Sequence, residues 1–250
     1  MRHGSGLAAR ALLVAGLTAV ALGAGATVMT TTRQGVNFQV SEKEIPLYAK
    51  AVAFLHRHIE YRLLAREIAR GLRSDRERVL AVFEWTRTHI RSTPPGWPIV
   101  DDHVLHIIIR GHGVDDQQAD VFTTLARYTG LPAFWRQGRV VFSFVRVDGR
   151  WAMFDVANGL VFADASGAFV EVEELLRRPE LVQAIAGPRS IRGVPYRRCV
   201  EALGPFRVPE VLRAEQQMPW PRLRFEIRRA LQADGASPLS AGEALSYDGG

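Results

Sequence analysis

Three aspartates stand where a carboxylate could do chemistry. Asp115 and Asp116 follow the glycine loop of "GHGVDDQQADVFTTLARYTGLPA" and open an amphipathic segment, and Asp155 ends the apolar run "RWAMFD". If the fold brings Asp155 opposite Asp115, the pair could do acid/base work across a cleft or bind a cation. Structural roles are the alternative: Asp115 as a helix N-cap with Gln118 completing a capping box, and Asp155 as the end of a strand before a turn.

Neighbouring polar and aromatic residues could line a ligand cleft around these carboxylates. Gln117 follows Asp116 directly, and the indoles of Trp135 and Trp151 could form a sugar-binding surface. The alternative is that both tryptophans are core residues, because aromatic residues at alternating strand positions usually face the interior.

Metal and cofactor sites have little support in the sequence. His103, His106 and His112 could act as ligands, but no His-Glu-x-x-His pattern or cysteine pair accompanies them. We therefore predict no metal site and no cofactor, and we expect these histidines in exposed loops. Cys199 is the single cysteine, so an intrachain disulfide is excluded.

The elements that must position these residues are helices followed by strands. Apolar residues at helical spacing predict helices over residues 44–72 and 75–90, the second capped by Ser74, and a short helix over 103–110. After the helix that opens near Asp115, four short apolar runs and the turn at Asp148 and Gly149 predict an antiparallel sheet. A helix near Glu171 and an extended, proline-rich wrap ending in a helix complete the body. This order indicates the α+β class.

The ends of the chain differ in composition from the body. Basic residues precede an uncharged run whose most apolar part is Ala11 to Leu22. The pattern is typical of a secretory signal, and the run is also long enough for an uncleaved membrane anchor reaching from Ala11 to Met29. We predict a signal peptide or anchor over residues 1–32, one domain over 33–232 and a disordered tail over 233–250. Thr30 to Val40 is polar, and we expect a linker there. The expected location is the periplasm or the periplasmic side of the inner membrane.

The distribution of basic residues along the chain argues against nucleic-acid binding. The 32 basic and 26 acidic residues give a net charge of +6, and only Lys43 and Lys50 are lysines. The arginines are spread along the chain without an aromatic-interleaved stripe, so no nucleic-acid partner is predicted.

The segment from about Asp75 to Asp155 resembles the transglutaminase-like superfamily, whose core is a papain-like cysteine-protease fold. The resemblance follows the order of a helix "RERVLAVFEWTRTHI", a glycine loop opening a helix, the link "TGLPA" and the strand pair "VRVDGRWAMFD". Gly113, Asp115 and Ala119 fill positions where the family shows a glycine, a cysteine and an alanine. The resemblance implies N-terminal helices packed on an antiparallel sheet.

The same resemblance locates a catalytic triad that this sequence lacks. In the family, a cysteine thiolate attacks an amide carbonyl, a histidine shuttles the proton, and an aspartate orients the histidine. The corresponding positions here are Asp115, Val140 and Asp155, and no histidine follows His112. A carboxylate is a poor nucleophile toward amides, and without a histidine nothing protonates the leaving amine.

We interpret the chain as an exported protein of a bacterial envelope with a transglutaminase-like, catalytically inactive domain. By analogy with exported family members, its cleft would bind cell-envelope peptides, polysaccharide or an assembly partner. One alternative is an active carboxylate-based hydrolase using Asp115, Asp116 and Asp155, which requires converging carboxylates in an open cleft and at least one raised pKa. A second alternative is an anchored scaffold that acts through its C-terminal wrap.

Overall fold

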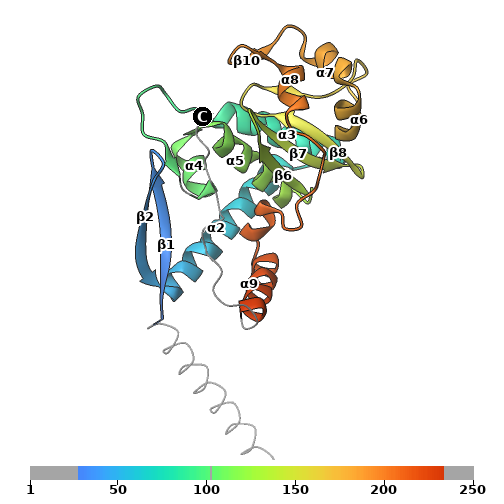
Figure 1. Cartoon of the computed structure of the whole chain (residues 1–250). Coiled ribbons are helices and arrows are strands. Elements are labelled where there is room, and N and C mark those ends of the chain that lie inside the picture. Colours follow the sequence, from blue (N-terminus) through green and yellow to red (C-terminus); the bar gives the residue numbers. More distant parts are fainter. Residues whose placement is uncertain (1–27, 102, 234–250) are drawn as a thin grey trace, which may run out of the picture.

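A central helix and a four-stranded antiparallel sheet organise the fold. The computed structural model describes residues 28–101 and 103–233, and Figure 1 shows its mixed α+β architecture. Helix α5, Asp115–Tyr128, packs on the sheet, whose strand order is β6-β7-β8-β9. The strands are β6 Ala133–Gln137, β7 Val141–Val147, β8 Arg150–Asp155 and β9 Leu160–Val161. The predicted α+β class and antiparallel sheet are confirmed.

In the described part of the chain, three helices precede α5, as the sequence predicts. They are α2 Leu47–Ile68, α3 Asp75–His89 and α4 Val104–Arg110. Ser74 caps α3: its Oγ accepts a hydrogen bond from the Glu77 amide at 3.1 Å, and the Glu77 carboxylate accepts from the Ser74 amide at 3.0 Å. This reciprocal capping box satisfies two amides at the start of α3 and fixes where the helix begins.

The two faces of the sheet are buried under different parts of the chain. Because side chains alternate along a strand, Ala152 and Phe154 of β8 join the core formed with α3 and α5, and Met153 joins a second core. The C-terminal helices cover this second face: α6 Val172–Arg177, α7 Pro179–Ala186 and α8 Tyr196–Glu201. The sheet is therefore a middle layer between two sets of helices.

The C-terminal part is more helical than the extended wrap predicted from its prolines. After α8 come the 3-10 helix η1, Arg213–Gln217, and α9, Pro219–Ala233, which confirms the predicted final helix. Short pairings complete the fold: β10 Ser190–Ile191 with β11 Val194–Pro195, and β3 Arg91–Ser92 with β5 His112–Gly113. Two of the prolines stand at helix starts, Pro195 as the N-cap of α8 and Pro219 as the first residue of α9, and the fixed φ of proline suits such positions.

The predicted linker at Thr30 to Val40 is wrong. These residues belong to an antiparallel hairpin, β1 Met29–Val36 and β2 Gln39–Pro46, and β1 also pairs with β4, Val100–Asp101. Threonine and valine favour strands, and Asn37 and Phe38 turn the chain with φ values of 49° and 65°, as a tight hairpin requires.

The predicted signal segment lies outside the described residues except for its end, because β1 begins at Met29. Of the predicted tail, only Ala233 is described, as the last residue of α9. In the part of the chain that the structure describes, no helix combines the length and apolar composition needed to cross a membrane.

Candidate functional site

Asp155 is a buried hydrogen-bonding hub. Its side chain is fully buried at the end of β8, on the sheet face that the C-terminal helices cover. Asn158 donates to its carboxylate from the backbone amide at 3.0 Å and from the side-chain amide at 2.9 Å, and the Tyr196 hydroxyl of α8 donates to it at 2.8 Å. Burial raises the pKa of Asp155 in spite of these bonds. Both carboxylate oxygens are thus already used inside the protein.

Asp115 lies near Asp155 at the start of α5, where the resemblance places a nucleophile. Its charge contributes to raising the pKa of Asp155, after the larger effect of burial. The prediction that Asp115 caps the helix is wrong. Val114 is the N-cap, and Asp115 is the first helical residue. The side-chain oxygen Oε1 of Gln117 accepts a hydrogen bond from the Val114 backbone amide at 3.2 Å. Asp115 is half-buried and makes no hydrogen bond or ion pair with another described residue.

Val140, which the sequence resemblance aligns with the family's histidine, is part of the hydrophobic core. Its side chain is 7% exposed and belongs to the cluster with Phe142, Phe162 and Tyr196, which lies between the sheet and α8. Apolar side chains therefore surround Val140.

Gln117 and Asp116 lie in the first turn of α5 and make separate contacts. Gln117 is buried, donates to the Val100 carbonyl at 2.7 Å and accepts from Arg110 at 3.0 Å, so it holds the preceding loop against α5. Asp116 accepts from the Gln117 amide at 2.8 Å. Burial raises the pKa of Asp116, and Asp120 and Asp101 add to the rise. The carboxylates near α5 thus fall into two groups, Asp115 with Asp155 and Asp116 with Asp101 and Asp120.

Asp120, one turn into α5, is a buried carboxylate in an ion pair with exposed Arg213, which sequence reasoning missed. Arg213 of η1 contacts its carboxylate at 2.7 Å, and the indole Nε1 of Trp135 donates to it at 2.8 Å. The Arg213 guanidinium also lies 5.5 Å from the centre of the Trp135 ring. Trp135 is therefore held between α5 and η1.

We expect the stability of the protein to fall with rising pH because of Asp120. Burial raises the pKa of Asp120, while Arg213 and Trp135 lower it by less. In the unfolded chain the carboxyl ionises first, so the free energy of unfolding decreases as the pH rises from the unfolded pKa of about 4 to the folded value. Denaturation between acid and neutral pH should show a smaller decrease in Asp120→Asn than in the wild type, because Asp116 and Asp155 also have raised pKa values and remain in the variant.

Asp164→Asn provides the control of opposite sign. Asp164 is exposed, and hydrogen bonds from Ser166 and from neighbouring amides lower its pKa. The stabilisation that Asp164 gives to the folded state therefore increases as the pH rises through the pKa of Asp164 in the folded protein. It is complete above the pKa of Asp164 in the unfolded chain. If the free energy of unfolding of the wild type minus that of Asp120→Asn does not change with pH, burial does not raise the pKa of Asp120.

The prediction that Trp135 and Trp151 share one cleft is wrong. Residues directly opposite in the sheet share a face, and Trp135 pairs with Ser143, which pairs with Phe154 on the α5 side. Trp151 is three residues before Phe154, so it lies on the other face, where it packs against Phe134 with ring centres 5.2 Å apart. The two-residue period of a strand separates the two indoles.

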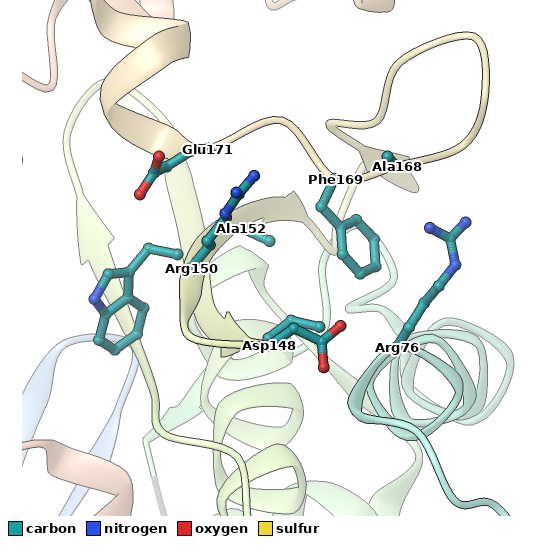
Figure 2. A pocket seen from close by; sticks show the side chains of 9 residues that line it. Arg76, Asp148, Arg150, Ala152, Ala168, Phe169 and Glu171 are labelled. Atoms are coloured by element: carbon teal, nitrogen blue, oxygen red, sulfur yellow. The ribbon is translucent and has the colours of Figure 1, made fainter.

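Trp151 instead lines a surface cavity at the hairpin end of the sheet. Figure 2 shows this cavity, which has a volume of about 320 Å³ and combines two aromatic rings with four charged groups. Its charged lining residues are Arg76, Asp148, Arg150 and Glu171. None of these four side chains forms an ion pair with another described residue.

The cavity is held by three segments that are tied together. The Arg76 guanidinium of α3 lies 5.2 Å from the centre of the Phe169 ring. Gly167 makes room for it, since a Cβ at this position would lie 3.0 Å from an Arg76 nitrogen. The Asp148 amide in the β7–β8 turn donates to Asp75 at 3.2 Å. Arg76 is therefore positioned before any ligand arrives.

The histidines and the cysteine do not form a metal site or a reactive pair. The rings of His103 and His106 lie 6.0 Å apart, and His112 packs edge-on against Trp97. Among residues 28–101 and 103–233, no three potential ligands gather at one point. Cys199 is buried within α8, and burial raises the pKa of its thiol, so the reactive thiolate is disfavoured.

Comparison with known proteins agrees with the fold. Residues 62–172 match the family model of the transglutaminase-like superfamily. No curated protein matches the chain.

Solved structures similar to this chain include three of interest. A candidate cysteine protease from Cytophaga hutchinsonii is 17% identical, with 49% of this chain and 53% of that chain covered and a TM-score of 0.35. A candidate protease from Parabacteroides distasonis is 10% identical, with 58% and 40% covered and a TM-score of 0.31. A TGase is 13% identical, with 55% and 46% covered and a TM-score of 0.29. This chain thus spans about half the length of these proteins, and such low scores assign no role to individual residues.

Proposed function

We propose that the chain is an exported protein of a bacterial envelope that binds its target without turning it over, on the basis of the match of residues 62–172 to the transglutaminase-like superfamily. Export rests on the apolar run from Ala11 to Leu22 behind a basic start, and the run up to Met29 would serve as signal or membrane anchor. The observation that carries the loss of catalysis is Val140, because it occupies the place of the proton-transferring base and is packed into the core.

Amide chemistry needs a nucleophile and a group that protonates the leaving amine. Asp115 supplies a carboxylate without a neighbouring base, and Asp155 has both oxygens occupied by Asn158 and Tyr196. A group without free lone pairs or access to solvent cannot orient a second residue or hold a substrate. This part of the fold therefore contributes stability in place of catalysis.

The cavity in Figure 2 is the binding site that suits this function best. Its volume of about 320 Å³ is at the lower end of the range of ligand pockets. Arg76 and Arg150 can bind a carboxylate, Asp148 and Glu171 can bind an ammonium group, and Trp151 and Phe169 offer apolar surface. Free peptides carry both charges, so we assign the cavity to a short peptide of the cell envelope. Polysaccharide and an assembly partner are the other targets to test.

We expect binding without turnover in one set of assays. The full chain and Asp115→Ala should show no hydrolysis or transfer on amide, ester and glycan substrates. Short cell-wall peptides with free amino and carboxyl ends should bind both proteins, and Arg76→Ala should weaken binding about tenfold or more, because a charge-assisted hydrogen bond is lost. Calorimetry would measure the affinity. Arg73→Ala, an exposed arginine three residues earlier and outside the cavity, is the matched control. Equal binding by all variants would remove the peptide assignment.

A carboxylate-based hydrolase is the second candidate, and one observation favours it. Burial raises the pKa values of both Asp116 and Asp155, and a raised carboxyl pKa is a common property of a general acid. The same substrate panel decides between the two functions. Turnover that Asp115→Ala and Asp116→Asn abolish, with unchanged stability, would establish the hydrolase.

A further inference from the structure

Helix α2 exposes an apolar stripe to solvent. Its five side chains, each between 49% and 63% exposed, are Tyr48, Val52, Leu55, Ile59 and Leu63. Successive members are three or four residues apart, so they lie on one side of the helix. Tyr61 and Ala65, on a different side, are the residues that α2 buries. The exposed stripe is therefore additional to the core-facing side of the helix.

Helix α9 exposes a second stripe, which is edged by arginines. Trp220 is 73% exposed, and Leu223 and Ile227 are about half exposed. Arg224 and Arg228, each one residue beyond a member of the stripe, are exposed and form no ion pair with the described residues. Helices with tryptophan and leucine on one side and arginine on the other typically lie in the interface of a membrane.

The first part of the α2 stripe and the α9 stripe lie toward the end of the molecule where the described chain begins (Figure 1). Helix η1 contacts α2 and α9, so it connects the two helices. The Leu47 amide at the start of α2 donates to the Val28 carbonyl at 2.8 Å, and Val28 and Met29 are themselves about half exposed. Figure 1 shows the start of β1, the start of α2 and helix α9 away from the C-terminal helices α6 to α8.

We propose that this end of the molecule docks on an anionic phospholipid surface. The α9 and α2 stripes would enter the boundary between headgroups and acyl chains, and Arg224 and Arg228 would bind phosphates with their planar guanidinium groups. This surface is separate from the peptide cavity and does not depend on the loss of catalysis.

Charge favours lipid over a second copy of the chain. Arg62 and Arg66 are exposed near the end of the α2 stripe, as Arg224 and Arg228 are beside the α9 stripe. A second copy on the α9 stripe would bring like charges together at its edge, which opposes association. Anionic headgroups supply the opposite charge.

The test uses the full chain and vesicles with brominated acyl chains, which quench nearby tryptophan fluorescence. Phosphatidylcholine vesicles with phosphatidylglycerol should quench the wild type more than vesicles without it. Trp220→Phe should abolish this anion-dependent quenching. Trp97→Phe is the matched control, because Trp97 is 57% exposed in the loop whose Ile99 bonds the hairpin turn at Asn37, at the other end of the hairpin from Val28.

A second pair of variants tests the role of charge. Arg224→Glu with Arg228→Glu should lower the affinity for the anionic vesicles about tenfold or more, and Arg73→Glu with Arg207→Glu should leave it nearly unchanged. Quenching that persists in Trp220→Phe would overturn the proposal, since lipid contact would then lie elsewhere. A dimer that Leu223→Asp dissociates, without any anion-dependent quenching of Trp220, would also overturn it and identify a second copy as the occupant.

Discussion

Replacing Asp155 by alanine is expected to destabilise the protein by about 3 kcal/mol at neutral pH, because the buried Tyr196 hydroxyl and two Asn158 donors lose their acceptor at once. The Tyr196 hydroxyl is the most costly of them, since Tyr196 is almost fully buried and its 2.8 Å bond to Asp155 has no substitute nearby. Asn158 is exposed, so its amide groups can turn to water. Removal of a buried carboxylate with a raised pKa relieves part of the loss. Chemical denaturation measures the net effect.

Conservative variants separate this structural role from a catalytic one. Asp155→Asn keeps the shape and one acceptor, so we expect a loss of about 1 kcal/mol, and Tyr196→Phe should cost about the same. If Asp155 were an active acid, Asp155→Asn would abolish a turnover and leave stability almost unchanged. A stability loss in Asp155→Ala no larger than in Tyr196→Phe would show that the carboxylate is not the centre of the network.

The sequence predicted best those features that arise from neighbouring residues. The capping box needs only Ser74 and Glu77, and the hairpin at Asp148 needs only a turn residue followed by glycine. The order of helices and strands followed from periodicity in the same way. The β1–β2 hairpin was missed because its strands are polar on both faces, with almost every residue exposed or half-buried, so no apolar alternation marks them.

The arrangement of the site depended on contacts that no local pattern contains. Tyr196 lies 41 residues from Asp155, and nothing in the sequence pairs them. Asp120 and Arg213 are paired only because η1 packs on α5. Sequence reasoning could have found Asn158, three residues after Asp155. Aspartate side chains in turns often accept hydrogen bonds from backbone amides two or three residues later in the chain. The place of Val140 was predicted through the resemblance, but its burial under α8 was not.

Restoring the triad residues should lower stability and yield no activity. Asp115→Cys alone should fold normally, because Asp115 is half-buried and its side chain contacts no described partner through hydrogen bonds or charge. The start of α5 should lower the pKa of the new thiol, so it should react with iodoacetamide faster than buried Cys199 does. This variant separates access to the position from the capacity for catalysis.

Val140→His is the step that we expect to fail. It puts a polar ring into a cluster with Phe142 and Phe162, which should cost about 2–4 kcal/mol through lost apolar burial and an imidazole without a partner. Asp155 cannot orient this imidazole unless it releases Tyr196 or Asn158. The double variant Asp115→Cys with Val140→His should therefore unfold at lower denaturant than Asp115→Cys and show no amide hydrolysis or transfer. Turnover by the double variant at wild-type stability would show that only two side chains separate this domain from an active enzyme, and that α8 leaves room for a substrate. Loss of stability in Val140→His without turnover would instead agree with the packing of Val140 and Tyr196 in one hydrophobic core with the C-terminal helices.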